Sequence, residues 1–173
     1  MFPPAPTLRA QPVFGLEVDL HALSARGPVA LVFTRFLGSP HARASLFALN
    51  AAYPDFDRQG VALVAVSDSS LRAARDFVPR YQLLFPLICD PEHQHYAAFE
   101  VPVGGPGDVP RALLSGALDP SIYSLGHGRI DGQLLQRPAA FIVRSGQLAW
   151  RWDAPHCFAQ LDPAELLAQA LTT

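Results

Sequence analysis

The feature that most constrains this chain is a junction between an apolar strand and a helix. Residues 29–33, Val-Ala-Leu-Val-Phe, form a continuous apolar run of strand length, which is typical of a strand covered on both faces. Six residues later, Ser39 and Pro40 favour a helix start, with serine as the N-cap and proline at the first helical position. The sequence therefore predicts a buried strand that passes through a short turn into a helix.

Strands and helices continue to alternate along the rest of the chain. Pro54 is expected to kink or end the helix that starts at Ser39. Further strands are predicted at residues 61–66, 85–89, 139–143 and 147–152, with helices after residues 70, 90 and 162. The last two strands flank Ser145-Gly146, a good hairpin turn. This order predicts the α/β class, with a mainly parallel central sheet, a late antiparallel hairpin and helices on both faces.

Composition favours a single well-packed domain. The chain has 173 residues, of which 50% are hydrophobic and only 16% are charged. A chain of this length buries roughly 70% of its unfolded surface when it folds as one domain. Residues 1–12 contain four prolines and little periodicity, so they are predicted to form an extended arm. Residues 13–173 are predicted to form the domain.

Charge and hydropathy exclude several kinds of partner. The net charge is −2 with a pI near 6.3, and the sequence has no Lys/Arg cluster, so we expect no nucleic-acid partner. The longest apolar runs fall far short of the ~20 residues that cross a bilayer, so we expect no membrane partner. The N-terminus does not have the pattern of a signal peptide, and there are only two cysteines. We therefore expect a cytoplasmic protein.

The two cysteines and the histidines give no strong chemical signal. Cys89 ends an apolar run and is expected to be a small buried filler, and Cys157 is expected to be a loop cysteine without function. Neither is predicted to lie where a strand passes into a helix, so redox activity through them is disfavoured. The histidines show no compact metal-binding spacing, and the glycine-rich residues 102–107 lack a phosphate-loop Lys-Ser/Thr. We expect no metal and no cofactor.

Four segments carry a resemblance to a known family. They are Leu31-Val-Phe-Thr-Arg-Phe-Leu-Gly-Ser-Pro-His-Ala-Arg, Leu49-Asn-Ala-Ala-Tyr-Pro-Asp-Phe, Phe85-Pro-Leu-Ile-Cys-Asp-Pro-Glu followed by Tyr96, and Arg137-Pro-Ala-Ala-Phe-Ile-Val. From about Val13 to Leu171 the chain resembles the peroxiredoxin-like branch of the alkyl hydroperoxide reductase and thiol-specific antioxidant (AhpC/TSA) family. The resemblance implies a thioredoxin-like fold and an antioxidant thiol peroxidase.

The resemblance breaks where the family does its chemistry. Members with this layout usually carry Gly-Cys-Pro-x-Cys at the strand-to-helix turn. Here Ser39 stands at the first cysteine, Pro40 at the proline and Ala42 at the second cysteine. A thiolate at a helix N-terminus has a lowered pKa and attacks a peroxide oxygen, whereas an alcohol has no comparable ionisation and no reversible oxidation steps. We therefore expect the peroxidase to be inactive in this chain.

Other residues near this turn are candidate ligand-binding groups. The resemblance places Arg137 near the reactive position and Pro138 where thioredoxin folds commonly hold a cis-proline. The N-terminus of the helix, with Pro40, His41 and the Ser39 hydroxyl, is a candidate pocket for a peroxide or a small anion. The alternative function is therefore a non-enzymatic binding or interaction module that uses this helix N-terminus for an anion or a partner.

Several questions stay open at this level. Ser39 and Ala42 are either engineered replacements or a natural loss of the two thiols. An active relative would need a thiol reductant protein as a partner. Trp150 and Trp152 share one face of a predicted strand, which leaves a homodimer as a further possibility. The substrate and the electron donor are not specified by these residues.

Overall fold

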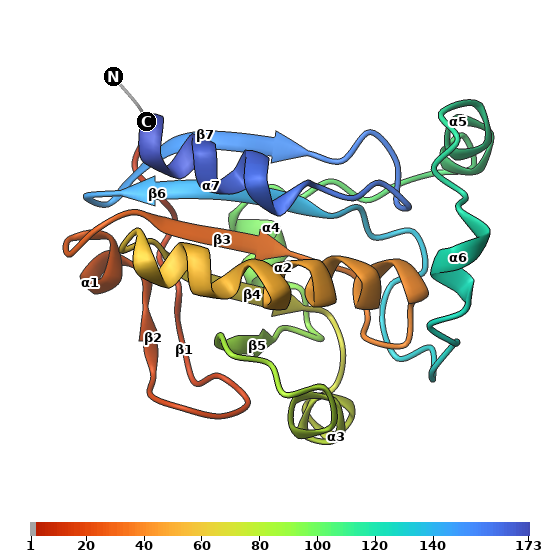
Figure 1. Ribbon diagram of the computed structural model, residues 1–173, viewed down its shortest axis with the longest axis horizontal. Helices are drawn as coiled ribbons and strands as arrows, with labels where there is room; N and C mark the ends of the chain where they lie inside the picture. The colour runs from red at the N-terminus through yellow and green to blue at the C-terminus, as the bar shows by residue number, and fades with distance from the viewer. Residues whose placement is uncertain (1–2) are drawn as a thin grey trace.

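The computed structural model describes residues 3–173. Seven strands and seven helices follow one another in these residues (Figure 1). The strands are β1 (Arg9–Ala10), β2 (Val18–Asp19), β3 (Val29–Phe33), β4 (Ala62–Ser67), β5 (Leu87–Cys89), β6 (Ala139–Arg144) and β7 (Gln147–Asp153). The helices are α1 (Leu20–Ser24), α2 (Pro40–Arg58), α3 (Leu71–Tyr81), α4 (Gln94–Ala98), α5 (Asp108–Leu114), α6 (Pro120–Tyr123) and α7 (Pro163–Thr172).

Five of the strands form the central sheet, in the order β5-β4-β3-β6-β7. Strands β3, β4 and β5 are parallel, with Leu31 opposite Val64 and Val66 opposite Ile88. Strand β6 is antiparallel to β3 and β7 is antiparallel to β6, so the hairpin predicted around Ser145-Gly146 is confirmed. The sheet is therefore mixed, as in thioredoxin-like folds, and the predicted fold class is confirmed.

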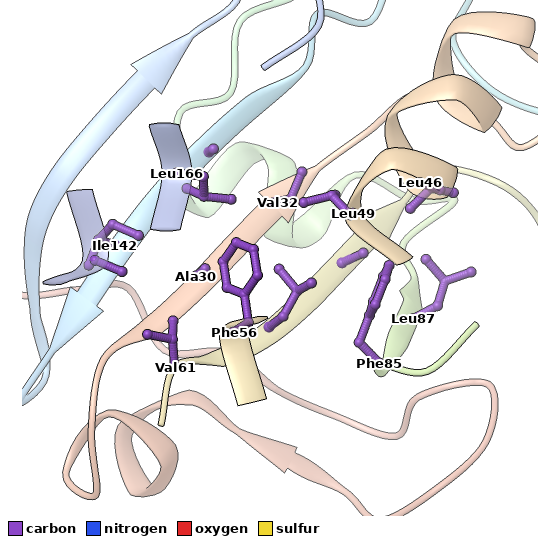
Figure 2. Close-up of a cluster of buried hydrophobic side chains, with 14 of the residues drawn as sticks. Ala30, Val32, Leu46, Leu49, Phe56, Val61, Phe85, Leu87, Ile142 and Leu166 are labelled. Carbon is purple, nitrogen blue, oxygen red and sulfur yellow. The ribbon is translucent and has the colours of Figure 1, made fainter. Parts of the chain in front are cut away.

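Each face of the sheet has its own hydrophobic core. Ala30 and Val32 of β3 point to one face, where α2, α3 and α7 cover the sheet. Figure 2 shows this core, in which Phe56 of α2 lies near Ala30 and Leu166 of α7. The alternate residues of β3 point to the opposite face, where Tyr96 and Phe99 of the α4 region pack against them. Because β3 is covered on both sides, all five of its residues are buried, as its apolar run predicts.

The predicted helix that starts at Ser39 is longer than the sequence indicates. Helix α2 runs from Pro40 to Arg58 with Pro54 inside it, so the helix does not end at Pro54, which was one of the two expected outcomes. The helix packs along β4 and α7, and the burial of Leu49 and Phe56 on either side of the proline outweighs the lost backbone hydrogen bond. This continuity matters because α2 carries the candidate site at its N-terminus.

The proline-rich N-terminus lies against the domain over its described part. Ala5 donates a backbone hydrogen bond to Gly146 (2.8 Å), and Leu148 donates one to Pro3 (2.9 Å). Leu8 is fully buried in the same core as Phe33. Residues 3–12 therefore add to the packing around the sheet, although they were expected to be an arm outside the domain.

A long connection between α4 and β6 covers one end of the sheet. This connection contains α5 and α6, which lie beyond the end of β3 and the start of α2 (Figure 1). Across the described residues, no helix is both long and apolar enough to cross a membrane.

Candidate functional site

The candidate site is the turn between β3 and α2, where Ser39 is the N-cap residue. Ser39 has an extended backbone (φ −73°, ψ 128°) and Pro40 follows at the first helical position, as predicted. The Ser39 side chain makes no capping hydrogen bond, although a capping serine normally accepts one. Its backbone N–H donates to Phe36 (2.9 Å), which closes the turn. The Ser39 hydroxyl therefore does not act as a helix cap.

The first turn of α2 is buried. Pro40, His41 and Ala42 all lie in the interior, so the Ala42 methyl group is buried. His41 is 3% exposed and makes edge-on contacts with Tyr123 (5.5 Å) and Phe158 (5.0 Å). Burial and then the neighbouring Arg35 cation lower the pKa of His41 to about 4, so the imidazole is neutral at pH 7.

Arg35, four residues before Ser39, is a buried cation without a carboxylate partner among residues 3–173. It is 5% exposed, and its guanidinium donates to the backbone carbonyls of Cys157 (3.2 Å) and Leu134. Its Nε–H is buried without a hydrogen-bond partner, as is Nε2 of His41. The guanidinium also lies 5.3 Å from the Phe158 ring centre. Arg35 and His41 therefore pack on the same aromatic ring, and each has an unused polar atom.

Arg137, the arginine indicated by the resemblance, has a different environment. Its Nε and one terminal nitrogen donate to the two oxygens of Asp108, at 3.0 and 2.6 Å. Asp108 also accepts the backbone N–H of Cys157 (2.8 Å). The hydrogen bonds of the Arg137 side chain all go to Asp108, and they lower the pKa of Asp108 to about 2. The structure thus pairs Arg137 with α5 and leaves Arg35 beside the first turn of α2.

Pro138 lies just before β6, as predicted, and lines a small apolar notch together with Thr34 and Trp152. No cis peptide bond occurs in the part of the chain that the structure describes, so the bond before Pro138 is trans. The Thr34 hydroxyl is buried there without a hydrogen-bond partner. The notch is therefore mainly apolar, with one free hydroxyl at its wall.

The turn is closed from outside by the connection that leads from α6 to β6. Gly128 donates a backbone hydrogen bond to Gly38 (2.9 Å), and Arg43 donates to the carbonyls of Leu125 (2.9 Å) and Gly126 (3.1 Å). A side chain at Gly38 would collide with the backbone of Gly128 and Arg129. Glycine at position 38 is therefore required by this close backbone contact rather than by its conformational freedom.

The two cysteines are not placed for thiolate chemistry. Cys89 is at the end of β5, and burial raises the pKa of its thiol to about 11. Cys157 is fully buried, and burial raises the pKa of its thiol despite the attraction of Arg35. Both thiols are free. Protonated thiols of this kind are poor nucleophiles toward peroxides.

His93 and His156 each have a partner of their own elsewhere in the fold. His93 contacts the buried Asp68 carboxylate (3.4 Å), and Nε2 of His156 is hydrogen bonded with Ser115 (3.1 Å). Within residues 3–173, no group of His, Cys, Asp and Glu side chains has the geometry of a metal site.

Sequence reasoning missed Arg35 and Asp108 as members of this region. Arg35 was part of the quoted segment Leu31–Arg43, but its burial without a carboxylate partner was not predicted. Asp108 lies in a glycine- and proline-rich stretch that resembled an ordinary loop. An arginine two residues after a buried apolar strand is a usable signal, because a side chain there starts at the edge of the core.

Comparison with known proteins decides the family. The AhpC/TSA family model matches residues 3–151. The chain belongs to the AhpC/TSA family. No curated protein sequence matches it.

Solved structures similar to this chain are peroxiredoxins and related proteins. Peroxidoxin BcpB from Mycobacterium tuberculosis has 14% identity and a TM-score of 0.68, over 98% of this chain and 95% of that one. Peroxiredoxin Q from Xanthomonas campestris has 20% identity and a TM-score of 0.67, over 95% and 90% of the two chains. A thiol:disulfide interchange protein from Chlorobium tepidum has 14% identity and a TM-score of 0.61, over 99% and 97%. At these identities the likeness establishes the thioredoxin-like fold of peroxiredoxins.

Proposed function

We propose that this AhpC/TSA protein is a peroxidase homologue that does not reduce peroxides, and that it uses the closed turn at Ser39 as a binding module. Family membership supports descent from peroxide-reducing enzymes. The observation that carries the proposal is the residue pair at the strand-to-helix turn, Ser39 and Ala42, which carry a hydroxyl and a methyl group at the two positions that the resemblance assigns to thiols. Neither group can be oxidised to a sulfenic acid and reduced again.

The two remaining cysteines do not restore the chemistry. A peroxidase thiol needs a lowered pKa, whereas burial raises the pKa of both Cys89 and Cys157. Neither lies at the N-terminus of a helix. Without a reactive thiol the protein needs no thiol reductant protein as a partner. Two free cysteines suit a reducing compartment, and we propose a cytoplasmic location.

A binding role at the turn is favoured by the environment of Arg35. A buried guanidinium with an unpartnered N–H lowers the free energy of unfolding. A ligand that accepts a hydrogen bond from this N–H would offset that cost. The position of Arg35 beside the N-terminus of the 19-residue helix α2 favours negative charge. We therefore place the ligand, a small anion, on the Arg35 side of the turn.

Peroxide consumption with dithiothreitol tests the loss of activity. The assay compares the unchanged protein with Ser39→Cys, Ala42→Cys and the double variant. We expect background consumption for the unchanged protein and for Ala42→Cys, and activity above background once residue 39 is a cysteine. Thiol-dependent turnover by the unchanged protein would disprove the proposal, and an inactive double variant would show that more than the two thiols has been lost.

A homodimer through the face of β7 that carries Trp150 and Trp152 stays a prediction. Trp150 and Trp152 are half-buried and pack against the core on the α7 side, which leaves part of each ring at the surface. Light scattering after size-exclusion chromatography measures the mass directly. A mass near 18.7 kDa at all concentrations would exclude the dimer.

A further inference from the structure

Residues 125–134 close the turn between β3 and α2, and the first half of this segment is hydrogen bonded to that turn and to α2. We call this segment the strap. Gly128 of the strap donates to Gly38 (2.9 Å), and the Arg43 guanidinium on α2 donates to two strap carbonyls. A Cβ atom on Gly128 would lie 2.9 Å from the Gly38 Cα and 2.5 Å from an Arg43 nitrogen. The close seating of the strap therefore depends on glycine at position 128.

The second half of the strap is fastened to the turn that follows β4. The Asp131 carboxylate accepts the hydroxyl of Ser69 (2.9 Å), and it accepts both the hydroxyl (2.8 Å) and the backbone N–H (3.0 Å) of Ser70. The buried Asp68 accepts the backbone N–H of Gln133 (2.6 Å). The strap is thus attached at both ends by hydrogen bonds.

Apolar burial contributes little to holding the strap in place. Two of its large apolar side chains are mostly exposed: Ile130 shows 59% of its surface to solvent and Leu134 shows 55%. When a segment opens, water replaces each lost hydrogen-bond partner, so each bond costs only about 1 kcal/mol. Exposing a buried apolar side chain has no such compensation. A segment fastened mainly by hydrogen bonds is among the parts of a fold that open most readily.

Arg35 connects the strap to the interior. One of its terminal nitrogens donates to the Leu134 carbonyl of the strap, while its Nε–H has no partner among the described residues. His41, on the first turn of α2, packs on the same Phe158 ring and also has an unpartnered nitrogen. If the strap lifts, the guanidinium loses a weak neutral acceptor and becomes open to a charged one. An anion is the stronger acceptor for guanidinium.

We propose that the strap is a lid over a site for a small oxyanion, held by the Arg35 guanidinium and the N-terminus of α2. In the closed form Arg35 donates to the Leu134 carbonyl, and in the open form it donates to the anion. The site then accepts inorganic sulfate or phosphate, or a carboxylate of similar size. This inference rests on the proposed binding function; it narrows the small anion to an oxyanion and adds the gate.

Titration calorimetry with sodium sulfate, at constant ionic strength with sodium chloride, tests the proposal. The unchanged protein must spend binding energy to open the strap, so its apparent affinity is the affinity of the open form multiplied by the fraction of open molecules. Gly128→Ala loosens the strap at its contact with Gly38 and Arg43. We expect this variant to bind sulfate about tenfold more tightly than the unchanged protein.

Gly107→Ala is the matched control. Gly107 precedes α5 in the same connection, has φ −75°, and a Cβ atom there meets nothing within 4 Å. This variant should bind sulfate like the unchanged protein. Asp131→Asn loosens the opposite end of the strap, and it should raise the affinity in the same direction as Gly128→Ala. Hydrogen exchange should be faster over residues 125–134 in both loosened variants and unchanged in the control.

Arg35→Met tests the ligand-holding residue, and in the Gly128→Ala background it should abolish sulfate binding. Absence of sulfate binding in every protein would overturn the proposal. It would also be overturned if Gly128→Ala bound sulfate no more tightly than the unchanged protein although hydrogen exchange over residues 125–134 was faster. If Arg35→Met does not fold, the comparison of the two strap variants with Gly107→Ala still decides. Peroxide turnover by the unchanged protein would overturn the loss of activity without changing these binding results.

Discussion

Two arginines at the same end of the sheet differ in what surrounds their charge. Arg137 donates twice to the buried carboxylate of Asp108, so its charge is neutralised inside the fold. Arg35 donates only to backbone carbonyls and keeps an N–H without a partner among residues 3–173. The difference indicates that Arg137 stabilises the cover of the site, while Arg35 is available for a ligand.

The Arg137–Asp108 pair gives the largest expected effect. Asp108→Asn leaves the guanidinium without its charged partner, and breaking a buried pair in this way costs about 3–5 kcal/mol of the free energy of unfolding. Urea denaturation measures this change. The control is Asp153→Asn, which removes the more exposed partner of Arg151 and should cost less than about 1 kcal/mol. Equal effects of the two substitutions would mean that the Arg137 pair is not a structural element.

The next largest effect is the pH dependence that His41 gives to stability. The pKa of His41 is about 4 in the folded protein and 6.5 in the reference state, so the unfolded chain binds the proton more readily. The free energy of unfolding should therefore fall between about pH 6.5 and pH 4, by up to about 3 kcal/mol, and show no further loss from this group below that range. Denaturation of the unchanged protein and of His41→Phe, at pH 7.5, 5 and 4, measures this contribution as a difference.

Asp108 provides an internal comparison for this pH range. Its pKa is about 2 in the folded protein against 3.8 in the reference state, so its contribution is present above pH 4 and is lost between about pH 4 and pH 2. A His41→Phe protein that loses as much stability as the unchanged protein between pH 6.5 and pH 4 would show that other groups cause the loss.

A smaller effect separates the two arginines directly. Arg137→Met leaves the Asp108 carboxylate buried without its partner, whereas Arg35→Met removes a charge that no carboxylate neutralises. We expect Arg137→Met to be more destabilising than Arg35→Met by about 2 kcal/mol. Urea denaturation of the two variants side by side gives this difference. The comparison of the two arginines fails if Arg35→Met is the more destabilising change.

The sequence predicted the centre of the fold well and its cover poorly. The continuous apolar run at 29–33, the hairpin around Ser145-Gly146 and the helix predicted after residue 162 each depend on neighbours close in sequence, and all three are confirmed. The sequence left open whether α2 ends at Pro54, because burial of Phe56 against the sheet is a tertiary effect. Local patterns do not report such packing.

The candidate site was predictable only in part. The strand, the turn and the start of α2 follow from Val29–Phe33 and from Ser39-Pro40, and the absence of both thiols is read directly from the sequence. The strap, the pairing of Arg137 with Asp108 and the unpaired state of Arg35 depend on contacts between residues 29 to 122 positions apart. Such contacts leave no periodic signal in a single sequence.

Trapping of sulfenic acid with dimedone tests the central claim most directly. The unchanged protein is treated with hydrogen peroxide in the presence of dimedone, and labelling of Cys89 and Cys157 is followed by mass spectrometry. The account predicts that neither cysteine is labelled faster than the thiol of free cysteine, because burial raises the pKa of both. Rapid labelling of either residue in the folded protein would contradict it, because a working peroxidase thiol would then exist away from Ser39.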